Sequence, residues 1–170
     1  GCMLVVALII DPLLVAIALK RNPYPLVFRC FKESGVTAFF TRSSAANIPV
    51  NMSLCEKLGL DKEYYSVAIP LGATINMDGT AIYQGVCAIF IASCFGIDLT
   101  LSEMATIVIT ATLASVGTAG VPGAGMVMLA MVLTSVGLPV EGIALVAGVD
   151  RIFDMGRTVL NITGDASCAV

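Results

Sequence analysis

The chain has 170 residues, of which 58% are hydrophobic and only 12% are charged, and it contains no His and no Trp. Soluble domains carry a charged fraction of about 25%, and a soluble globule of this size could not bury so much apolar surface. The small net charge of −3 excludes a nucleic-acid partner, because the basic residues are too few to follow a phosphate backbone. The composition therefore predicts a membrane protein surrounded by lipid.

The same composition argues against an enzyme. The six cysteines form no CxxC pair, and without a histidine there is neither a zinc-like ligand cluster nor a nucleophile–histidine pair. We expect the cysteines to be reduced packing residues. Because the chain starts and ends inside apolar sequence, we also expect it to be part of a longer protein.

The first two apolar segments are residues 1–21 and 24–60. The first is interrupted by Asp11 and Pro12 and is expected to be a kinked span. The second is broken by a polar tip at residues 41–49. Basic residues lie near both of its ends, namely Lys20, Arg21, Arg29 and Lys32 at the start and Lys57 and Lys62 at the end. Because basic residues stay on the cytoplasmic side, this segment is expected to enter the membrane from the cytoplasm and return to it as a helical hairpin.

The third and fourth segments are residues 62–97 and 101–140. The third is expected to span the membrane with a break at residues 76–80. The fourth is too long for one straight span of about 20 residues, and residues 117–125 hold four glycines and a proline, which will not stay helical. Its flanks are acidic, so it is expected to be a second hairpin that enters from the outside.

These segments predict an all-α membrane protein with an inverted repeat, in which two re-entrant helical hairpins enter from opposite faces beside a broken transmembrane helix. Backbone at a hairpin tip cannot face lipid, so the tips are expected to line a cavity near the midplane, as in secondary transporters. The alternative is a protein with two spans and long interfacial helices.

The last segment, residues 142–170, carries a stripe of polar groups, namely Asp150, Asp154, Arg157, Thr158, Asn161 and Asp165. Without Thr158, which is adjacent to Arg157, the spacings are 4, 3, 4 and 4, so these groups lie on one helix face. Ionisable groups at membrane depth are costly and usually functional. Arg157 suits a carboxylate and Asp154 an ammonium group, which together match an amino acid. Asn161 and Asp165 offer oxygens for a small cation. The alternative is that these residues form an internal ion-pair network that only holds the helix in place. For Asp150 the sequence suggests no ligand.

The break at residues 76–80 reads Asn-Met-Asp-Gly-Thr. We expect Gly79 to let the helix unwind, so that freed carbonyls join Asp78 and the Asn76 amide oxygen around a cation. The plain alternative is a helix kink with a capping aspartate. The two hairpin tips direct helix N-termini at the midplane and would attract anionic groups. Alone, such tips would also suit a channel filter.

These motifs resemble the dicarboxylate/amino acid:cation symporters, the glutamate transporter homologues, over the whole chain. They are TRSSAANIPVN from Thr41, PLGATINMDGTAIYQG from Pro70, SVGTAGVPGAG from Ser115 and GVDRIFDMGRTVLNITGD from Gly148. The resemblance implies a transport domain made of the end of transmembrane helix 6 (1–21), hairpin 1 (24–60), broken helix 7 (62–97), hairpin 2 (101–140) and a truncated helix 8 (142–170). It also implies a scaffold outside this chain, a homotrimer in the bacterial inner membrane, and an elevator motion. This family is itself a standard example of inverted-repeat architecture.

The resemblance also implies site residues. The substrate contacts are Ser44, Thr80, Val121, Gly125, Asp154, Arg157, Thr158 and Asn161. One sodium site maps to Gly72, Asn76, Asn161 and Asp165, a second to Thr74, Ser115, Val116 and Thr118, and a third to Asn76 and Asp78.

Two branches of the family compete for this sequence. The stretch from Arg21 to Met52 resembles the serine/threonine branch, whereas the stretch from Asn76 onward resembles the acidic amino acid branch. Because Asp78, Asp154 and Arg157 are all present, the sequence favours Na⁺-coupled symport of aspartate or glutamate. The alternatives are a Na⁺-coupled serine/threonine or other neutral amino acid symporter, a proton-coupled glutamate symporter and, in another class, an ion channel.

Overall fold

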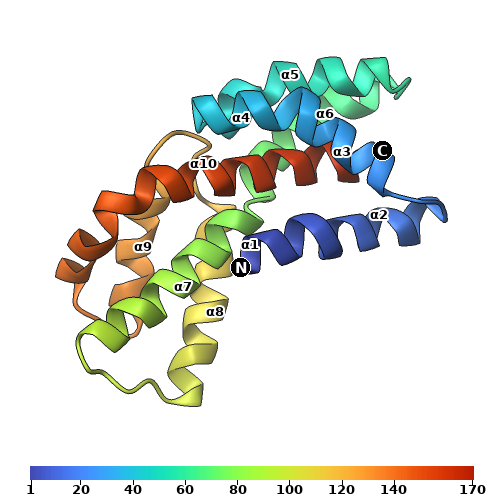
Figure 1. The fold of residues 1–170 in the computed structure, drawn as a ribbon. Coiled ribbons are helices and arrows are strands. Elements are labelled where there is room, and N and C mark those ends of the chain that lie inside the picture. Colours follow the sequence, from blue (N-terminus) through green and yellow to red (C-terminus); the bar gives the residue numbers. More distant parts are fainter.

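The computed structural model describes residues 1–170, which fold entirely into helices and connecting turns (Figure 1). The chain begins with one continuous helix made of α1 (Cys2–Val5), the π-helical turn η1 (Val6–Ile10) and α2 (Asp11–Leu19). Pro12 has no N–H to donate to the carbonyl of Leu8, which instead accepts a hydrogen bond from the Tyr24 hydroxyl at 3.3 Å. The interruption expected at Asp11 and Pro12 is therefore a local widening of the helix.

The next helices form a first helical pair. Its first arm comprises α3 (Tyr24–Cys30), the π-helical turn η2 (Phe31–Gly35) and α4 (Val36–Thr41), and its second arm is α5 (Ser44–Lys57). The chain turns at Arg42, which has a φ of 53°, and Ser43 caps α5 by accepting the Ala46 N–H at 3.1 Å. The polar tip is thus narrower than the expected residues 41–49, because this cap lets α5 start at Ser44.

The broken helix consists of α6 (Lys62–Ile75) and α7 (Asp78–Cys94), and only Asn76 and Met77 lie outside it. The expectation that Gly79 unwinds the helix is wrong, since Gly79 is helical. A Cβ atom there would lie 2.7 Å from the carbonyl oxygen of Arg157. This glycine is needed because α7 and the last helix approach each other closely.

A second helical pair follows, made of α8 (Leu101–Val116) and α9 (Ala124–Ser135), and the chain continues through the 3₁₀ turn η3 (Val140–Gly142) into α10 (Ile143–Cys168). The second arms of the two pairs end alike. Gly59 and Gly137 have φ of 80° and 69°, and the N–H of the residue after each returns to a carbonyl five residues earlier, at 3.1 and 2.9 Å.

α10 is the central helix and contacts both helical pairs, both halves of the broken helix and the first helix (Figure 1). The main core, of 13 buried residues, lies between α7, α8, α9 and α10. The first pair is fixed to α10 by polar contacts as well. The Asn51 amide donates to the Ile162 carbonyl at 3.0 Å and accepts from the Ser34 hydroxyl.

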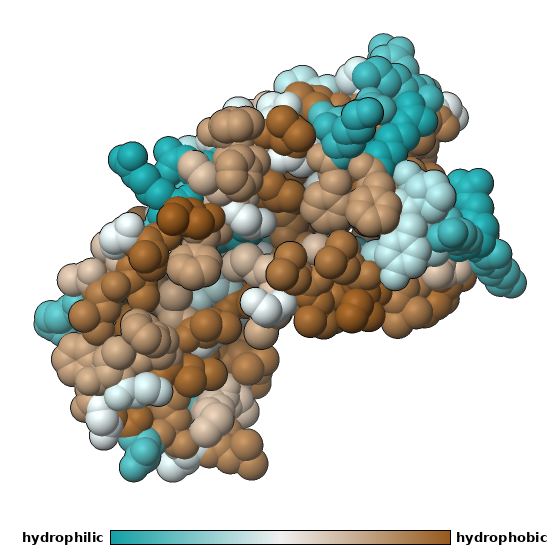
Figure 2. All heavy atoms as spheres, in the orientation of Figure 1, coloured by the Kyte–Doolittle hydropathy of each residue, from teal (hydrophilic) through white to brown (hydrophobic).

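Most of the surface in Figure 2 is hydrophobic, and hydrophilic residues gather at the α2–α3 and α5–α6 turns, at one end of the molecule. Phe40 and Ile152 are 74% and 70% exposed. Two helical stretches, Cys2–Leu19 and Lys62–Cys94, are long and apolar enough to cross a membrane. An apolar surface of this extent fits lipid contact.

Replacing Gly79 by alanine is expected to destabilise the full-length protein by about 1–3 kcal/mol or more, because the new methyl group meets backbone that cannot rotate away. Gly85→Ala, on the same helix and with nothing within 4 Å of the new Cβ, is the matched control. Thermal unfolding in detergent measures both. Equal unfolding temperatures in the two variants would contradict the close approach of α7 and α10.

Candidate functional site

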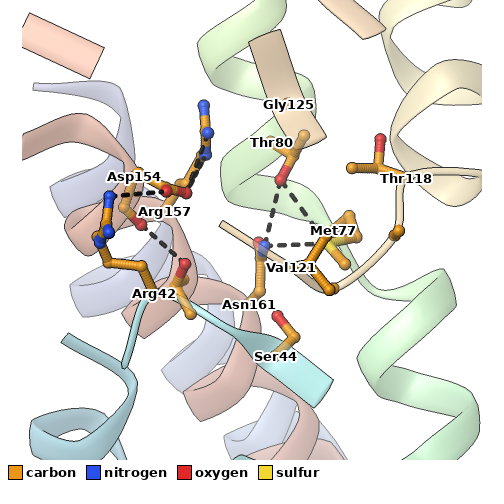
Figure 3. A pocket seen from close by; sticks show the side chains of 13 residues that line it. Arg42, Ser44, Met77, Thr80, Thr118, Val121, Gly125, Asp154, Arg157 and Asn161 are labelled. Atoms are coloured by element: carbon orange, nitrogen blue, oxygen red, sulfur yellow. Dashed lines mark hydrogen bonds and ion pairs between the residues drawn. The ribbon is translucent and has the colours of Figure 1, made fainter. Parts of the chain in front are cut away.

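A small cavity lies where the tips of the two helical pairs meet α7 and α10 (Figure 3). Its volume of about 20 Å³ has room for one water molecule. All eight substrate contacts implied by the sequence line this cavity. The other lining residues, which the sequence did not mark as substrate contacts, are Arg42, Met77, Thr118, Ala119 and Gly120.

Arg157 is at the centre of a buried ion-pair network. Its Nη1 lies 3.3 Å from Asp150 Oδ1, and its Nε donates to Asp154 Oδ1 at 3.1 Å. The other Asp154 oxygen lies 3.8 Å from Nη1 of Arg42, so two arginines flank this carboxylate (Figure 3). Two carboxylates and two guanidinium groups give the network no net charge. Asp150, for which the sequence suggested no ligand, is thus a partner of Arg157.

The Nη2 atom of Arg157 forms an ion pair but no hydrogen bond within the protein. Nη2 lies 3.0 Å from Asp154 Oδ1, outside hydrogen-bond direction, and it has no hydrogen-bond partner in the protein. The face of the guanidinium lies over the Tyr83 ring, 4.4 Å from its centroid. Gly125 packs beside it, and a Cβ atom there would lie 2.8 Å from Cζ of Arg157. The arginine is therefore held rigidly while keeping N–H groups for a further acceptor.

The two tips are in direct contact. The carbonyl of Gly120 accepts hydrogen bonds from the Ser43 hydroxyl at 2.7 Å and from the Ala45 N–H at 3.0 Å. The N–H of Gly123 points to Asp154 Oδ2 at 3.3 Å. Because the closed cavity holds only about one water molecule, an amino acid can enter it only when these contacts separate.

Asn161 joins the broken helix to α10. Its Oδ1 accepts the Gly79 N–H at 2.8 Å, and its Nδ2 donates to Thr80 Oγ1 at 3.3 Å and to Met77 Sδ at 3.2 Å. Thr158 donates to the Asp154 carbonyl at 2.7 Å. No sequence signal singled out Met77, because a methionine in an apolar chain is ordinarily a packing residue.

A second group of predicted residues surrounds Asp165. The Asn76 amide donates to Asp165 Oδ1 at 2.9 Å and lies 3.5 Å from the main-chain carbonyl of Asn161. Asp165 Oδ2 is buried without a partner, and a Cβ at Gly72 would lie 2.7 Å from Oδ1. Asp78 lines the same cavity as Asp165, Asn76 and Gly72. Carboxylate and carbonyl oxygens of this kind suit a hard cation, so the residues present fit Na⁺.

The remaining predicted sodium ligands are Thr74, Ser115, Val116 and Thr118. The hydroxyls of Thr74, Ser115 and Thr118 each donate to a carbonyl three or four residues earlier, at 2.8 Å in all cases. Thr74 and Val116 are exposed, whereas Thr118 lines the substrate cavity. A sodium site at these residues stays a prediction.

The sequence is similar to those of known sodium-coupled symporters. The chain matches the model of the Sodium:dicarboxylate symporter family over residues 1–170. It is 48% identical, over 99% of its length, to the "Serine/threonine transporter SstT" of Bifidobacterium adolescentis, and it spans 40% of the length of that relative. The chain is therefore a membrane protein that belongs to the sodium:dicarboxylate symporter family.

Proposed function

We propose that the full-length protein is a Na⁺-coupled symporter of serine and threonine, and that this chain is its substrate-binding transport domain. The observation that carries the substrate class is the neutral network of Arg157, Asp150, Asp154 and Arg42. A zwitterionic amino acid adds no net charge to this buried site, whereas aspartate or glutamate adds one negative charge that lacks a counterion. The similarity to a serine/threonine transporter supports the same choice.

In this proposal different lining residues bind different chemical groups of the substrate. Asp154 accepts the ammonium group, and N–H groups of the two tips take the α-carboxylate. Arg157 holds Asp154 in position and donates from Nη2 to the substrate hydroxyl. The neighbouring polar groups complete the shell, and Val121 and Gly125 form its wall. These polar groups are Ser44, Thr80, Thr158 and Asn161.

One sodium ion would bind between Asp165, the carbonyls near Gly72 and Asn76, and the main chain of Asn161. A second would bind at residues 74 and 115–118, and a third at Asp78. Bound Na⁺ supplies the positive charge that Asp165 lacks. Asn161 links the two sites, because its side chain accepts the Gly79 N–H at the substrate cavity while its main-chain carbonyl lies 3.5 Å from the amide of Asn76, a predicted sodium ligand. Ordering this residue for one ligand therefore favours the other.

The membrane arrangement that we propose is the inverted repeat expected from the sequence, with both helical pairs re-entering from opposite faces. The meeting of the two tips on α10 supports it. The wide apolar surface would contact lipid and the scaffold of a homotrimer in the plasma membrane, and the domain would move as an elevator.

An acidic amino acid is the second candidate. The observation that favours it is the free Nη2 of Arg157, since a guanidinium edge with unused donors suits a carboxylate. Coupling to protons is the corresponding alternative for the ion.

Uptake by the full-length protein in proteoliposomes tests the proposal. We expect labelled serine to accumulate when Na⁺ is outside and K⁺ inside, and excess threonine to inhibit this uptake more than excess aspartate does. Uptake driven equally well by a pH gradient in Na⁺-free buffer would refute sodium coupling. Inhibition by aspartate and not by threonine would instead favour the second candidate, an acidic amino acid. Ion conductance without substrate would indicate a channel.

A further inference from the structure

A second cavity, of about 410 Å³, lies between α2, α6, α7 and the end of α10, and it shares no lining residue with the substrate cavity. Three of its lining residues are aspartates that come from three different helices: Asp11, Asp78 and Asp165. Asp11 and Asp165 are only 5% and 6% exposed. No lysine or arginine lines the cavity, and none of the three aspartates forms an ion pair.

The two cavities therefore differ in their charge balance. In the substrate cavity, the Asp154 carboxylate faces two guanidinium groups, and Asp150 behind it pairs with Arg157. In the second cavity, three carboxylates share one space without any positive side chain. Buried carboxylates that lack a partner are costly, so they either take up a proton or have their charge balanced by cations from solution.

Asp11 is directed at the same part of α10 as the Asn76–Asp165 pair. A Cβ atom at Gly164 would lie 3.0 Å from Nδ2 of Asn76 and 3.8 Å from Oδ2 of Asp11. Oδ2 of Asp165 is buried without a hydrogen-bond partner, whereas its Oδ1 accepts from the Asn76 amide. The buried carboxylates of Asp11 and Asp165 thus line one cavity, beside Gly164, where a side chain would crowd the Asn76 amide.

The size of the cavity indicates the kind of cation. No three acidic or thiol side chains converge closely enough to chelate one metal ion, and the volume leaves space for water. This arrangement suits partly hydrated monovalent cations better than a tightly chelated divalent ion.

We propose that Asp11 is a ligand of a coupling cation, which it binds together with Asp78 in this cavity. The proposal rests on the proposed sodium coupling and extends it to the first helix, which lies outside both helical pairs. The π-helical turn η1 ends at Ile10, immediately before Asp11, and such turns often occur at functional sites.

The test is a Na⁺ titration of thermal unfolding with the purified, substrate-free full-length protein, in which choline chloride keeps the ionic strength constant. Binding of Na⁺ to the folded state raises the free energy of unfolding by RT ln(1 + [Na⁺]/Kd), so the Na⁺ concentration above which the unfolding temperature begins to rise reports the Kd. We expect Asp11→Asn to raise the Kd for Na⁺ that is fitted from this titration by about tenfold or more. In choline alone this variant should unfold at the same or a higher temperature than the wild type, because one unpaired buried charge is gone. Asp98→Asn, in the exposed α7–α8 turn, is the control and should behave like the wild type.

An unchanged Na⁺ titration in Asp11→Asn would refute the role of Asp11 while leaving sodium coupling intact. A wild-type protein stabilised equally by Na⁺ and choline would instead refute sodium binding and the proposed function with it. If Asp11→Asn does not fold, the same Na⁺ titration is made with Asp11→Glu, whose longer side chain moves the ligand oxygen. A changed Na⁺ affinity in Asp11→Glu then supports the proposal, and an unchanged affinity overturns it.

Discussion

Replacing Arg157 by alanine is expected to weaken amino acid binding strongly. The change leaves Asp150 and Asp154 buried with only the more distant Arg42 as a counterion. Removing one partner of a buried charge pair at a binding site costs about 2–5 kcal/mol of binding free energy, so the affinity should fall by about 30-fold to a few thousandfold. Binding of labelled serine to the purified full-length protein measures the loss.

Arg151→Ala is the matched control, because Arg151 is an exposed arginine on the same helix and belongs to no ion pair. It should bind serine like the wild type. Arg157→Lys keeps the charge but cannot contact both aspartates with one planar group, and it should give an intermediate affinity. Full affinity in Arg157→Ala would show that the network only braces α10 and that the substrate binds elsewhere.

Replacing Asp165 by asparagine is expected to weaken sodium binding strongly. Asp165 Oδ2 is a buried acceptor without a partner, and its charge has no counterion in the protein. The amide has the same shape but no charge, so the half-saturating Na⁺ concentration for serine uptake should rise by at least about tenfold. Serine affinity at saturating Na⁺ should recover, because Asp165 does not line the substrate cavity.

Asp98→Asn serves here as the control for the loss of one carboxylate. An unchanged Na⁺ dependence together with weaker serine binding would contradict this prediction. It would show that Asp165 has a structural role in α10 and does not bind the cation.

Periodicity predicted the polar face of α10 because a helix fixes which side chains share a face. All six members of that stripe are buried. The glycine-rich tip and the Asn76–Met77 break were likewise readable, because glycine, proline and the polar run mark places where a helix ends in an apolar chain. The family motifs then named eight residues that line one cavity.

Other features depend on contacts between distant segments and had no local signal. Arg42 reaches Asp154 only because the chain turns at Arg42 with a positive φ. Gly79 reads as a helix breaker, yet its role comes from the backbone of Arg157 on another helix. Asp11 reads as part of a proline kink, and its cavity exists only once α2 lies against α10.

The most direct test of this account is a competition titration on the purified full-length protein, in which serine, threonine and aspartate displace labelled serine with and without Na⁺. We expect saturable serine binding that requires Na⁺, displacement by threonine at similar concentrations, and weak displacement by aspartate. Serine binding that is equally tight without Na⁺, or a site that binds aspartate and not serine, would contradict it.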